Sequence, residues 1–334
     1  THPVISIPEL IRILVNNEGL SFEKALEIAK KTFNYTNHTV MAEAMEKWGL
    51  DIVKEVLPEI YDIILQINEA FVAEMYPQLL SYYKWWYQKR DHNRNGMCEY
   101  GATDGTLEAA AWESGMDNAI RFDDAVMLKN DGADDAWSMD QESVDLNAYL
   151  ALECKLLKKF AGLLNVAFDG PDYSDKVADY FFDKQLNFFF DRRLKDGSFI
   201  EEPGCEAYTP LWTQIATQSQ VDSMLPILQD TAKFSTYIPF PTIAADNPKY
   251  NPRGYWRGPI WLDQTYFAIR GLRNYGYHKL ADEYTLQVFD RLNGLKEGAP
   301  IHENYGTHTG ERLKAPHFSW SSSHLLMMYD DYGK

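Results

Sequence analysis

Cysteine and long apolar runs are both scarce in this sequence. Its 334 residues include three cysteines, Cys98, Cys154 and Cys205, an odd number that shares no metal-ligand spacing. We therefore expect free buried thiols rather than a disulfide framework or a zinc site. An unbroken apolar run of about 18 residues, which a membrane-spanning helix requires, does not occur, and neither does the charged, apolar and small-residue succession of an export signal. The sequence thus predicts a soluble protein that does not enter a membrane.

Positive charge is the next shortage. The 32 Lys and Arg residues face 49 Asp and Glu residues, which gives a formal net charge of −17. A surface this acidic repels nucleic acids and anionic membranes, so we expect neither as a partner, whereas neutral sugars remain compatible. Aromatic residues, by contrast, are abundant at 14%, with nine Trp and 21 Tyr. Most of them must serve ordinary packing, and carbohydrate stacking is one use for the excess.

Helical periodicity dominates the chain, and alternating strand patterns are almost missing. The predicted helices lie at 8–15, from 21 onward, and at 50–71, 79–86, 143–160, 173–190, 211–216, 220–232, 262–275, 279–292 and 319–329. Polar connectors separate them, notably the Asp-containing run 129–135 and the loop 251–261, which is dense in Pro, Gly and aromatic residues. This succession of helix, loop and helix predicts an all-α protein.

The stretch 112–119, with the sequence WESGMDNA, is the first candidate for catalysis. It places Asp117 between a small-residue turn and an amide, with Trp112 close by. An acid that protonates a glycosidic oxygen needs a partly desolvated pocket that raises its pKa, and aromatic faces supply both the pocket and a platform for a sugar ring. The alternative is that the same Ser, Gly, Asp and Asn residues only form a turn and a helix N-cap.

The stretch 90–97, with the sequence RDHNRNGM, has the front half of an EF-hand-like calcium loop. Oxygen ligands at alternate positions are followed by a glycine turn and a backbone carbonyl. The candidate ligands are Asp91, Asn93, Asn95 and the carbonyl of Met97. The glutamate expected at the twelfth position is missing, because Ala102 stands there, so a distal ligand must come from elsewhere. A plain turn rich in Asp and Asn is the alternative.

Several motifs in a fixed order resemble glycoside hydrolase family 63, the inverting α-glucosidases. In chain order they read WWY at 85–87, RDHNRNG at 90–96, EYG at 99–101, WESGMDNA at 112–119, VDLNAYL at 144–150, NPRGYWRGPIW at 251–261 and ENYG at 303–306. The resemblance covers about 71–334. It implies an (α/α)₆ barrel, an exo-acting hydrolase that releases glucose from an α-linked oligosaccharide with inversion, calcium near the 91–97 loop, and a bacterial-type cytoplasmic or periplasmic location. It leaves the oligomeric state open.

The resemblance also assigns roles to two carboxylates 186 positions apart. Asp117 would be the general acid and Glu303 the general base, and we expect both on loops between helices that meet at one end of the barrel. Inversion requires room for a water molecule, so the carboxyl groups should stand roughly 6.5–9.5 Å apart. Glu303 taken alone could instead be a capping or tyrosine-bonded loop acid.

The aromatic loop 251–261 borders the pocket in this family, and we therefore expect sugar-binding side chains there and nearby. The candidates are Trp112, Tyr255, Trp256, Arg257, Trp261 and Trp320. A structural corner without ligand contact is the alternative for the loop. For the whole chain, the alternative function is a non-catalytic sugar-binding protein or an inert helical scaffold.

Residues 1–72 resemble a different family, the α-glucan phosphorylases. The motifs are THP at 1–3, IPEL at 7–10, YTNHTVMAEA at 35–44, LP at 57–58 and QIN at 66–68. The resemblance places His2 and His38 at the glucosyl site of phosphorylases. No stretch resembles the domain that binds pyridoxal phosphate, so we expect neither this cofactor nor phosphorylase activity, and both histidines would be leftover polar groups on helices.

The two resemblances together predict a chimeric or designed chain. Its parts would be a phosphorylase-like helical segment, 1–72, and a family 63-like catalytic barrel, 73–334, joined inside a helix near 70–76. The N-terminal helices would complete the barrel. Because a misplacement of about 1 Å in catalytic loops can cost about 100-fold in rate, we expect the fold and site to survive such a join with activity that is weak or lost.

Overall fold

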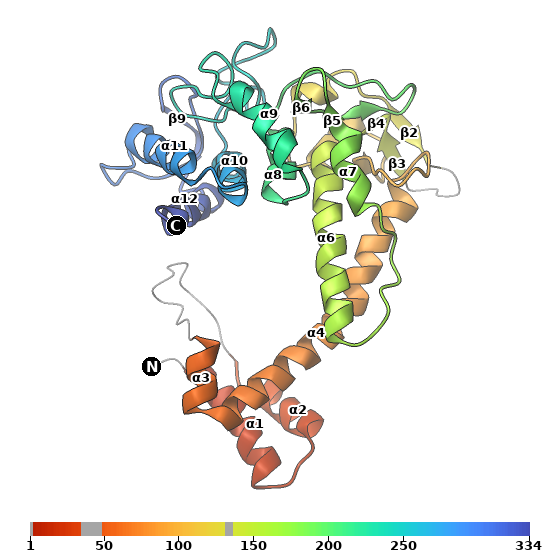
Figure 1. Cartoon of the computed structure of the whole chain (residues 1–334), viewed down its shortest axis with the longest axis vertical. Helices are drawn as coiled ribbons and strands as arrows, with labels where there is room; N and C mark the ends of the chain where they lie inside the picture. The colour runs from red at the N-terminus through yellow and green to blue at the C-terminus, as the bar shows by residue number, and fades with distance from the viewer. Residues whose placement is uncertain (1–2, 35–48, 131–135) are drawn as a thin grey trace. The chain divides into compact units, whose positions relative to one another are not determined.

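The computed structural model describes residues 3–34, 49–130 and 136–334. Its contacts divide the chain into two compact units: Thr1–Leu80 with Leu157–Phe168, here the N-terminal unit, and Ser81–Leu156 with Asp169–Lys334, here the C-terminal unit (Figure 1). The predicted phosphorylase-like histidines, His2 and His38, lie outside the described residues.

Helices make up the N-terminal unit. A short 3-10 helix (Pro3–Ile5) precedes α1 (Ser6–Asn16), α2 (Phe22–Thr32), α3 (Leu50–Val56) and the first part of α4 (Pro58–Lys89). Ser21 caps α2, since its hydroxyl accepts a hydrogen bond from the Lys24 amide at 3.3 Å, which satisfies one of the free N–H groups at the helix start. Ile11, Ala25, Ala29 and Ile63 form the buried centre where α1, α2 and α4 meet. The predicted helix 50–71 is divided at Pro58, which begins α4.

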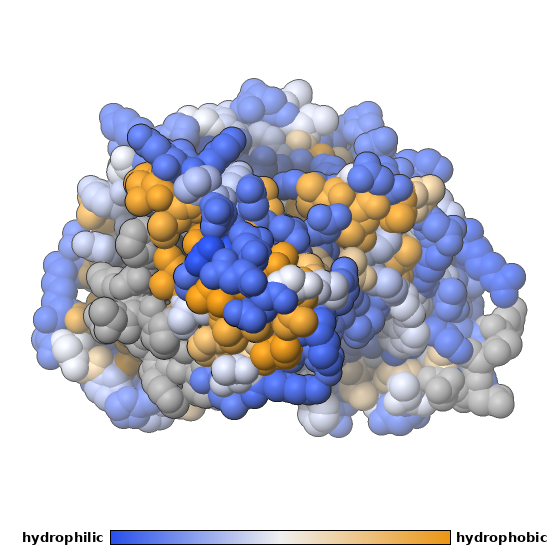
Figure 2. All heavy atoms as spheres, turned by 90° about the horizontal axis from the view of Figure 1, so that it is seen from below, coloured by the Kyte–Doolittle hydropathy of each residue, from blue (hydrophilic) through white to orange (hydrophobic). Residues whose placement is uncertain are grey.

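The same unit keeps many apolar side chains in contact with solvent. The large exposed ones are Val4, Ile5, Leu50, Ile52, Val56, Leu57, Leu65 and Phe71. The view from below shows apolar side chains interrupting a mostly hydrophilic surface (Figure 2). The predicted join, 70–76, lies within the unbroken helix α4, which passes from one unit into the other.

The C-terminal unit is also built mainly from helices. They are the last part of α4, then α5 (Leu107–Glu113), α6 (Val144–Leu163) as far as Leu156, α7 (Ser174–Phe181), α8 (Thr209–Trp212), α9 (Gln218–Leu228), α10 (Leu262–Asn274), α11 (His278–Arg291) and α12 (Ser319–Asp331), with 3-10 turns at Ile120–Phe122 and Cys205–Tyr208. Helix α10 is central to the packing, since it contacts α8, α11 and α12. Gly271 permits its close approach to α8, because a Cβ at this position would stand 2.6 Å from the Cβ of Leu211.

Within the described residues, four small antiparallel sheets occupy connections between these helices. The first has strand order β1-β3-β2, from Gly101–Ala102, Trp137–Met139 and Met127–Lys129. The others pair β4 (Gln141–Glu142) with β7 (Arg192–Arg193), β5 (Phe182–Asp183) with β6 (Phe188–Phe189), and β8 (His302–Tyr305) with β9 (Arg312–Pro316). In the described ranges no helix is long and apolar enough to cross a membrane.

Three predictions of local structure are wrong. Helix 173–190 ends at Phe181, and the β5–β6 hairpin follows, because aromatic residues favour strands and Asp183 holds the turn by accepting from the Gln185 amide at 2.7 Å. The helical pair 211–216 and 220–232 is shorter than expected, since α8 ends at Trp212 and α9 at Leu228. Glu303, expected on a loop, lies on strand β8.

Candidate active site

Asp117 lies in a tight turn that follows α5. Gly115 takes the left-handed conformation, with φ of 73°, and Ser114 closes the turn by donating to the Ala111 carbonyl at 2.6 Å and accepting from the Met116 amide at 3.0 Å. The turn predicted as the alternative is therefore present, and it holds Asp117 half-buried. Partial burial raises the pKa of the Asp117 carboxyl, and the negative charge of Glu303 raises it further.

Glu303 is held by donors on both carboxylate oxygens. The Tyr255 hydroxyl donates to its Oε1 at 2.7 Å, and the Ala315 amide donates to its Oε2 at 3.3 Å. The pairing of β8 with β9 shifts here, from His302 opposite Pro316 to Asn304 opposite Leu313, so that two residues of β9 lie opposite Glu303. Burial raises the pKa of Tyr255, and the hydrogen bond to Glu303 raises it further, so the tyrosine stays a neutral donor.

Asn118 ties the turn of Asp117 to the aromatic loop 251–261. Its Nδ2 donates to the Gly254 carbonyl at 2.9 Å, and its Oδ1 accepts from the Trp256 amide at 3.0 Å. Arg257 adds a bidentate ion pair with Asp123, at 2.6 and 2.9 Å. Segments almost 140 residues apart are therefore fixed to each other directly beside Asp117.

Four of the six predicted sugar-binding residues form one aromatic cluster. Trp256 and Trp261 stack with ring centroids 4.1 Å apart, Tyr255 contacts Trp261 edge-on at 5.1 Å, and Trp320 lies 5.5 Å from Trp261. The structure does not bring the other two into it. Trp112 lies at the end of α5 with 59% of its surface exposed, and the Arg257 guanidinium is engaged by Asp123.

A cavity of about 180 Å³ opens between this cluster and the turn of Asp117. Its lining consists of Ser114, Gly115, Met116, Tyr149, Trp256, Asp263, Gln264, Phe267, Trp320 and His324. Sequence reasoning did not identify the polar lining residues Tyr149, Asp263, Gln264 and His324. The one signal for Asp263 and Gln264 is their position directly after the aromatic loop, in the first turn of α10.

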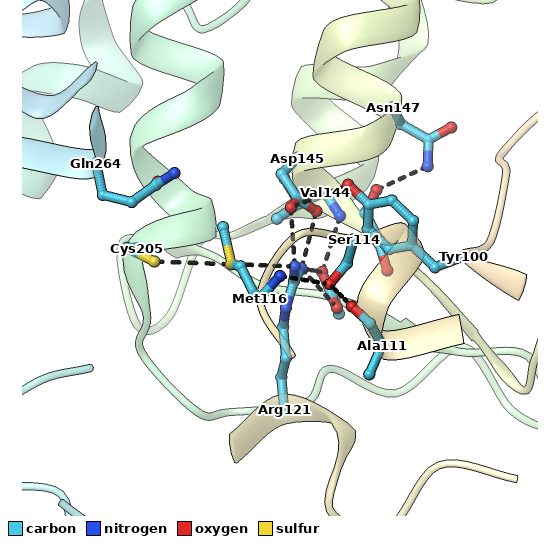
Figure 3. Close-up of polar contacts among 12 residues, drawn as sticks. Tyr100, Ala111, Ser114, Met116, Arg121, Val144, Asp145, Asn147, Cys205 and Gln264 are labelled. Atoms are coloured by element: carbon cyan, nitrogen blue, oxygen red, sulfur yellow. Dashed lines mark hydrogen bonds and ion pairs between the residues drawn. The ribbon is translucent and has the colours of Figure 1, made fainter. Parts of the chain in front are cut away.

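A buried ionic cluster supports the turn from below. Both Nη atoms of Arg121 donate to Asp145, each at 2.8 Å, and Nη1 also pairs with Asp191 at 3.1 Å. Arg121 Nη2 further contacts the Met116 sulfur at 3.5 Å (Figure 3). The residue that precedes Asp117 is thus packed directly on the cluster.

Three buried carboxyl groups, those of Asp145, Asp191 and Glu206, interact electrostatically with the single guanidinium of Arg121. Burial raises the pKa of Asp191 to about 6, against the positive charge of Arg121, which lowers it. Burial likewise raises the pKa of Glu206 to about 8, and the charge of Asp191 adds to the effect. Glu206 therefore holds its proton near neutral pH, which leaves the two aspartates as the carboxylates that share the single charge of Arg121.

The predicted calcium loop forms a compact turn around Asp91. The Asn95 and Gly96 amides donate to its two carboxylate oxygens, each at 3.0 Å. Glu142, on β4, reaches the same place from 47 residues away, and its Oε1 lies 2.6 Å from the side-chain nitrogen of Asn95 and 3.3 Å from that of Asn93. The sequence predicts that a distal ligand comes from outside the loop, and in the structure Glu142 lies beside the loop.

The loop's donor set suits a hard cation. In the described ranges, no three His, Cys, Asp or Glu side chains form a group that could hold a metal ion; here two carboxylates combine with amide and carbonyl oxygens, which is the ligand chemistry of calcium. Burial raises the pKa of Asp91, and the charge of Glu142 contributes. Buried Glu99 interacts electrostatically with Asp91, and its Oε1 has no hydrogen-bond partner in the part of the chain that the structure describes. The loop and Glu142 together offer the oxygen donors that a hard divalent cation prefers.

Comparison with known proteins supports the hydrolase resemblance over most of the chain. A family model for the mannosylglycerate hydrolase MGH1-like glycoside hydrolase domain matches residues 26–321. Two structures of the GH63 mannosylglycerate hydrolase from Thermus thermophilus, one with glucose and one with Tris and D-glycerate, are 19% and 18% identical, each with a TM-score of 0.61. Each match covers 84% of this chain, and 73% and 75% of the hydrolase chains respectively.

A further structural match is the neutral trehalase of Saccharomyces cerevisiae, 18% identical with a TM-score of 0.54, over 68% of this chain and 42% of the trehalase. At these identities the likeness carries the fold alone. The predicted fold class, all-α with an (α/α)₆ barrel, is confirmed by it.

The N-terminal resemblance is also confirmed, as a short segment. The chain is 53% identical over 72 residues to glycogen phosphorylase 2 of Dictyostelium discoideum and 49% identical over 80 residues to the glycogen phosphorylase of Bacillus subtilis (strain 168). These matches cover 22% and 23% of this chain but only 7% and 10% of the phosphorylases. The chain thus spans a tenth or less of the length of these curated relatives.

Proposed function

Because the chain belongs to the mannosylglycerate hydrolase MGH1-like glycoside hydrolase family, we propose that it is an exo-acting α-glucosidase that hydrolyses short α-linked gluco-oligosaccharides with inversion. One observation carries the proposal. Asp117 and Glu303 interact electrostatically beside an aromatic cluster, and burial together with the charge of Glu303 raises the pKa of Asp117. Two carboxyl groups in different environments are what acid and base catalysis at one pH requires.

The proposed roles follow from these environments. Asp117 donates its proton to the glycosidic oxygen as the bond to the anomeric carbon breaks. Glu303 accepts a proton from the water that attacks the opposite face of the sugar, so that the acid ends deprotonated and the base protonated. The hydrogen bonds from Tyr255 and Ala315 hold the Glu303 carboxylate in one orientation. For inversion we expect roughly 6.5–9.5 Å between the carboxyl groups of the acid and the base.

Substrates with different leaving groups test the two roles separately. With nigerose or trehalose, Asp117→Asn should lower kcat roughly 10²–10⁴-fold, because the leaving oxygen is no longer protonated. With α-glucosyl fluoride, whose leaving group needs no proton, the same variant should lose far less, whereas Glu303→Gln should fail on both substrates. Asp330→Asn, an exposed change on α12, is the control. Equal losses for both variants on both substrates, or an α-anomer as the first product seen by NMR, would reject the assignment.

Lys314 favours a second candidate substrate, a glycoside with an anionic aglycone. Its Nζ lies 5.5 Å from the centroid of the Tyr255 ring, and Tyr255 donates to Glu303, so a cation stands near the proposed base. Mannosylglycerate, which names the related hydrolase, has a carboxylate in its aglycone. Lys314→Met should raise KM for mannosylglycerate several-fold and leave KM for nigerose unchanged. No hydrolysis of mannosylglycerate, or an equal change in both KM values, would exclude this candidate.

We also propose a structural calcium ion at the loop that begins with Asp91. The ligands would be Asp91, Asn93, Asn95, the Met97 carbonyl and Glu142. When bound, the ion supplies positive charge that offsets the repulsion between the two carboxylates and joins the loop to β4. EDTA should then lower the melting temperature by several degrees, because an ion that binds only the folded state stabilises it. In Glu142→Gln the effect of EDTA should shrink, and an unchanged melting temperature of the parent protein would refute the site.

For the N-terminal segment we propose a scaffold role in a chain recombined from two parents, divided at about 72 and 73. The support is the short phosphorylase match, which includes a tenth or less of each phosphorylase. Pyridoxal phosphate and phosphate-dependent cleavage are not part of the proposal. Formation of glucose 1-phosphate from maltodextrin and phosphate would contradict it, and sugar binding without any hydrolysis would support the non-catalytic alternative.

A further inference from the structure

Two acceptor oxygens, on adjacent residues that line the 180 Å³ cavity, lack a donor in the part of the chain that the structure describes. They are Oδ1 of Asp263 and Oε1 of Gln264. Their side chains are 4% and 3% exposed, so neither oxygen is free to exchange with bulk solvent as a surface group would. A buried acceptor without a donor destabilises a protein, and an adjacent pair of them is unusual enough to require a reason.

The local hydrogen bonding shows which oxygen of each side chain is left without a donor. Gln264 Nε2 donates to Asp263 Oδ2 at 2.9 Å, which orients the amide and leaves its oxygen as the free atom. Figure 3 shows the Gln264 side chain extending from α10 towards Met116, which lines the same cavity. The first turn of α10 therefore carries two acceptors without donors on adjacent residues, and the cavity that these residues line also borders the turn that carries Asp117.

The chemistry of the wall selects a class of ligand. Two neighbouring acceptors require two neighbouring O–H or N–H donors, which adjacent hydroxyl groups of a sugar ring provide. Trp256 and Trp320 line the same cavity and offer apolar faces to such a ring. The carboxylate of Asp263 disfavours an anionic group here. At about 180 Å³ the cavity is smaller than the roughly 300–1,000 Å³ pockets that hold drug-sized ligands, so it suits one ring.

We propose that Asp263 and Gln264 bind two adjacent hydroxyl groups of the sugar ring that the enzyme releases, and thereby determine which sugar it accepts. This inference rests on the proposed hydrolase function, because it takes the ring in the cavity to be the one transferred to water. A site that hydrogen-bonds a substrate hydroxyl rejects an analogue without that hydroxyl strongly, since its buried acceptor is then left unpaired. Specificity would therefore depend on hydroxyl pattern more than on ring size.

Binding without turnover tests the inference independently of catalysis. Methyl α-glucoside and its four monodeoxy analogues would be titrated into the Asp117→Asn protein and followed by tryptophan fluorescence, which Trp256 and Trp320 should report. We expect two adjacent deoxy positions to weaken binding at least about tenfold and the other two to change it by less than about threefold. Binding that is insensitive to all four deletions would mean that the acceptors hold water only, and would overturn the inference.

Two apolar replacements of similar shape connect the effect to the residues. In Asp263→Leu and in Gln264→Met, we expect the penalty for one of the two sensitive deoxy positions to fall below about twofold. Asp290→Asn, an exposed change on α11, should keep the full pattern. Gln264→Glu retains an acceptor and serves if the methionine variant does not fold. An unchanged deoxy pattern in folded variants sinks this inference while hydrolysis persists, whereas absent hydrolysis with an intact pattern sinks the proposed function alone.

Discussion

Carboxyl groups of the C-terminal unit fall into two sets that differ in how their oxygens are used. Asp145 and Asp191 are at most 1% exposed and are bonded to Arg121. Asp117 and Glu303, in contrast, lie half-buried on a turn and on a hairpin. The buried set is bonded to a guanidinium inside the protein, whereas each member of the half-buried set has the other carboxylate as a charged neighbour.

The difference shows how one residue type serves structure or chemistry in the same domain. Where donors saturate a carboxylate, it fixes the backbone around it, as Asp191 does by accepting from the Val144 amide at 2.8 Å. Where burial is partial and the nearest charge is another carboxylate, the pKa rises and the group can exchange a proton. We therefore expect replacements in the buried set mainly to lower stability, and replacements in the half-buried set mainly to lower activity.

Removing the cation of the buried set should have the largest effect on stability. Arg121→Met leaves three carboxyl groups buried without a balancing charge, and breaking such a pair costs about 3–5 kcal/mol. Urea denaturation followed by circular dichroism would measure the loss. A loss below about 1 kcal/mol would contradict the difference between the two sets, because the ionic cluster would then contribute little to the stability of this region.

Glu206→Gln should have an intermediate effect that depends on pH. The pKa of Glu206 is raised by burial from an ordinary 4.5 to about 8, so the folded state keeps a proton that the unfolded state releases. The stability of the parent protein should therefore fall as the pH rises from about 4.5 to about 8. The glutamine variant should lack this part of the fall, and so gain stability at pH 8 but not at pH 4.5.

Melting temperatures of parent and variant across this pH range test the sign. Glu201→Gln, an exposed glutamate five positions earlier, is the control and should melt as the parent does at every pH. A glutamine variant that gains most at pH 4.5 would place an ionised Glu206 in the native cluster at neutral pH.

Asp117→Asn should have the smallest effect on stability. Because the pKa of Asp117 is raised in the folded state, its charge opposes folding above its unfolded pKa, and the asparagine variant should be slightly more stable at pH 7 and unchanged at pH 3. The group is only partly buried, so solvent screens its charge and we expect a gain of less than about 1 kcal/mol. Thermal melts at both pH values measure it, and a marked loss at pH 7 would move Asp117 into the structural set.

The sequence was informative where the signal is local. The apolar period of 143–160 predicted α6 to within three residues of its end, and the composition of 251–261 predicted a loop. Apolar periodicity gave a wrong prediction around Phe182 and Phe188, because a run of apolar residues fits a buried helix as well as a short hairpin. The extended backbone at Glu303 is a strand of four residues, too short for a periodic pattern.

Contacts between residues that are far apart in the sequence could not be predicted from local patterns. Arg121 donates to Asp191, 70 positions away, and Glu142 accepts from Asn95, 47 positions away. No spacing rule in the sequence connects either pair. Asp263 and Gln264 sit in the first turn of a helix, where an acid is expected anyway because it complements the helix dipole. Asp117 could be proposed from its local sequence, but Glu303 and the pairing of the two could be named only because family motifs carry them.

The pairing of β8 with β9 makes the position of Glu303 sensitive to deletions as well as to substitutions. Lys314 and Ala315 together lie opposite Glu303, and Lys314 adopts a left-handed φ of 59°, which a non-glycine residue rarely accepts. Deleting one of these residues would leave a single residue opposite Glu303 and would remove the local bend that the extra residue introduces. The proposed base could then be pointed away from Tyr255 with every site residue still encoded. Counting residues along this ribbon matters as much as keeping their identities.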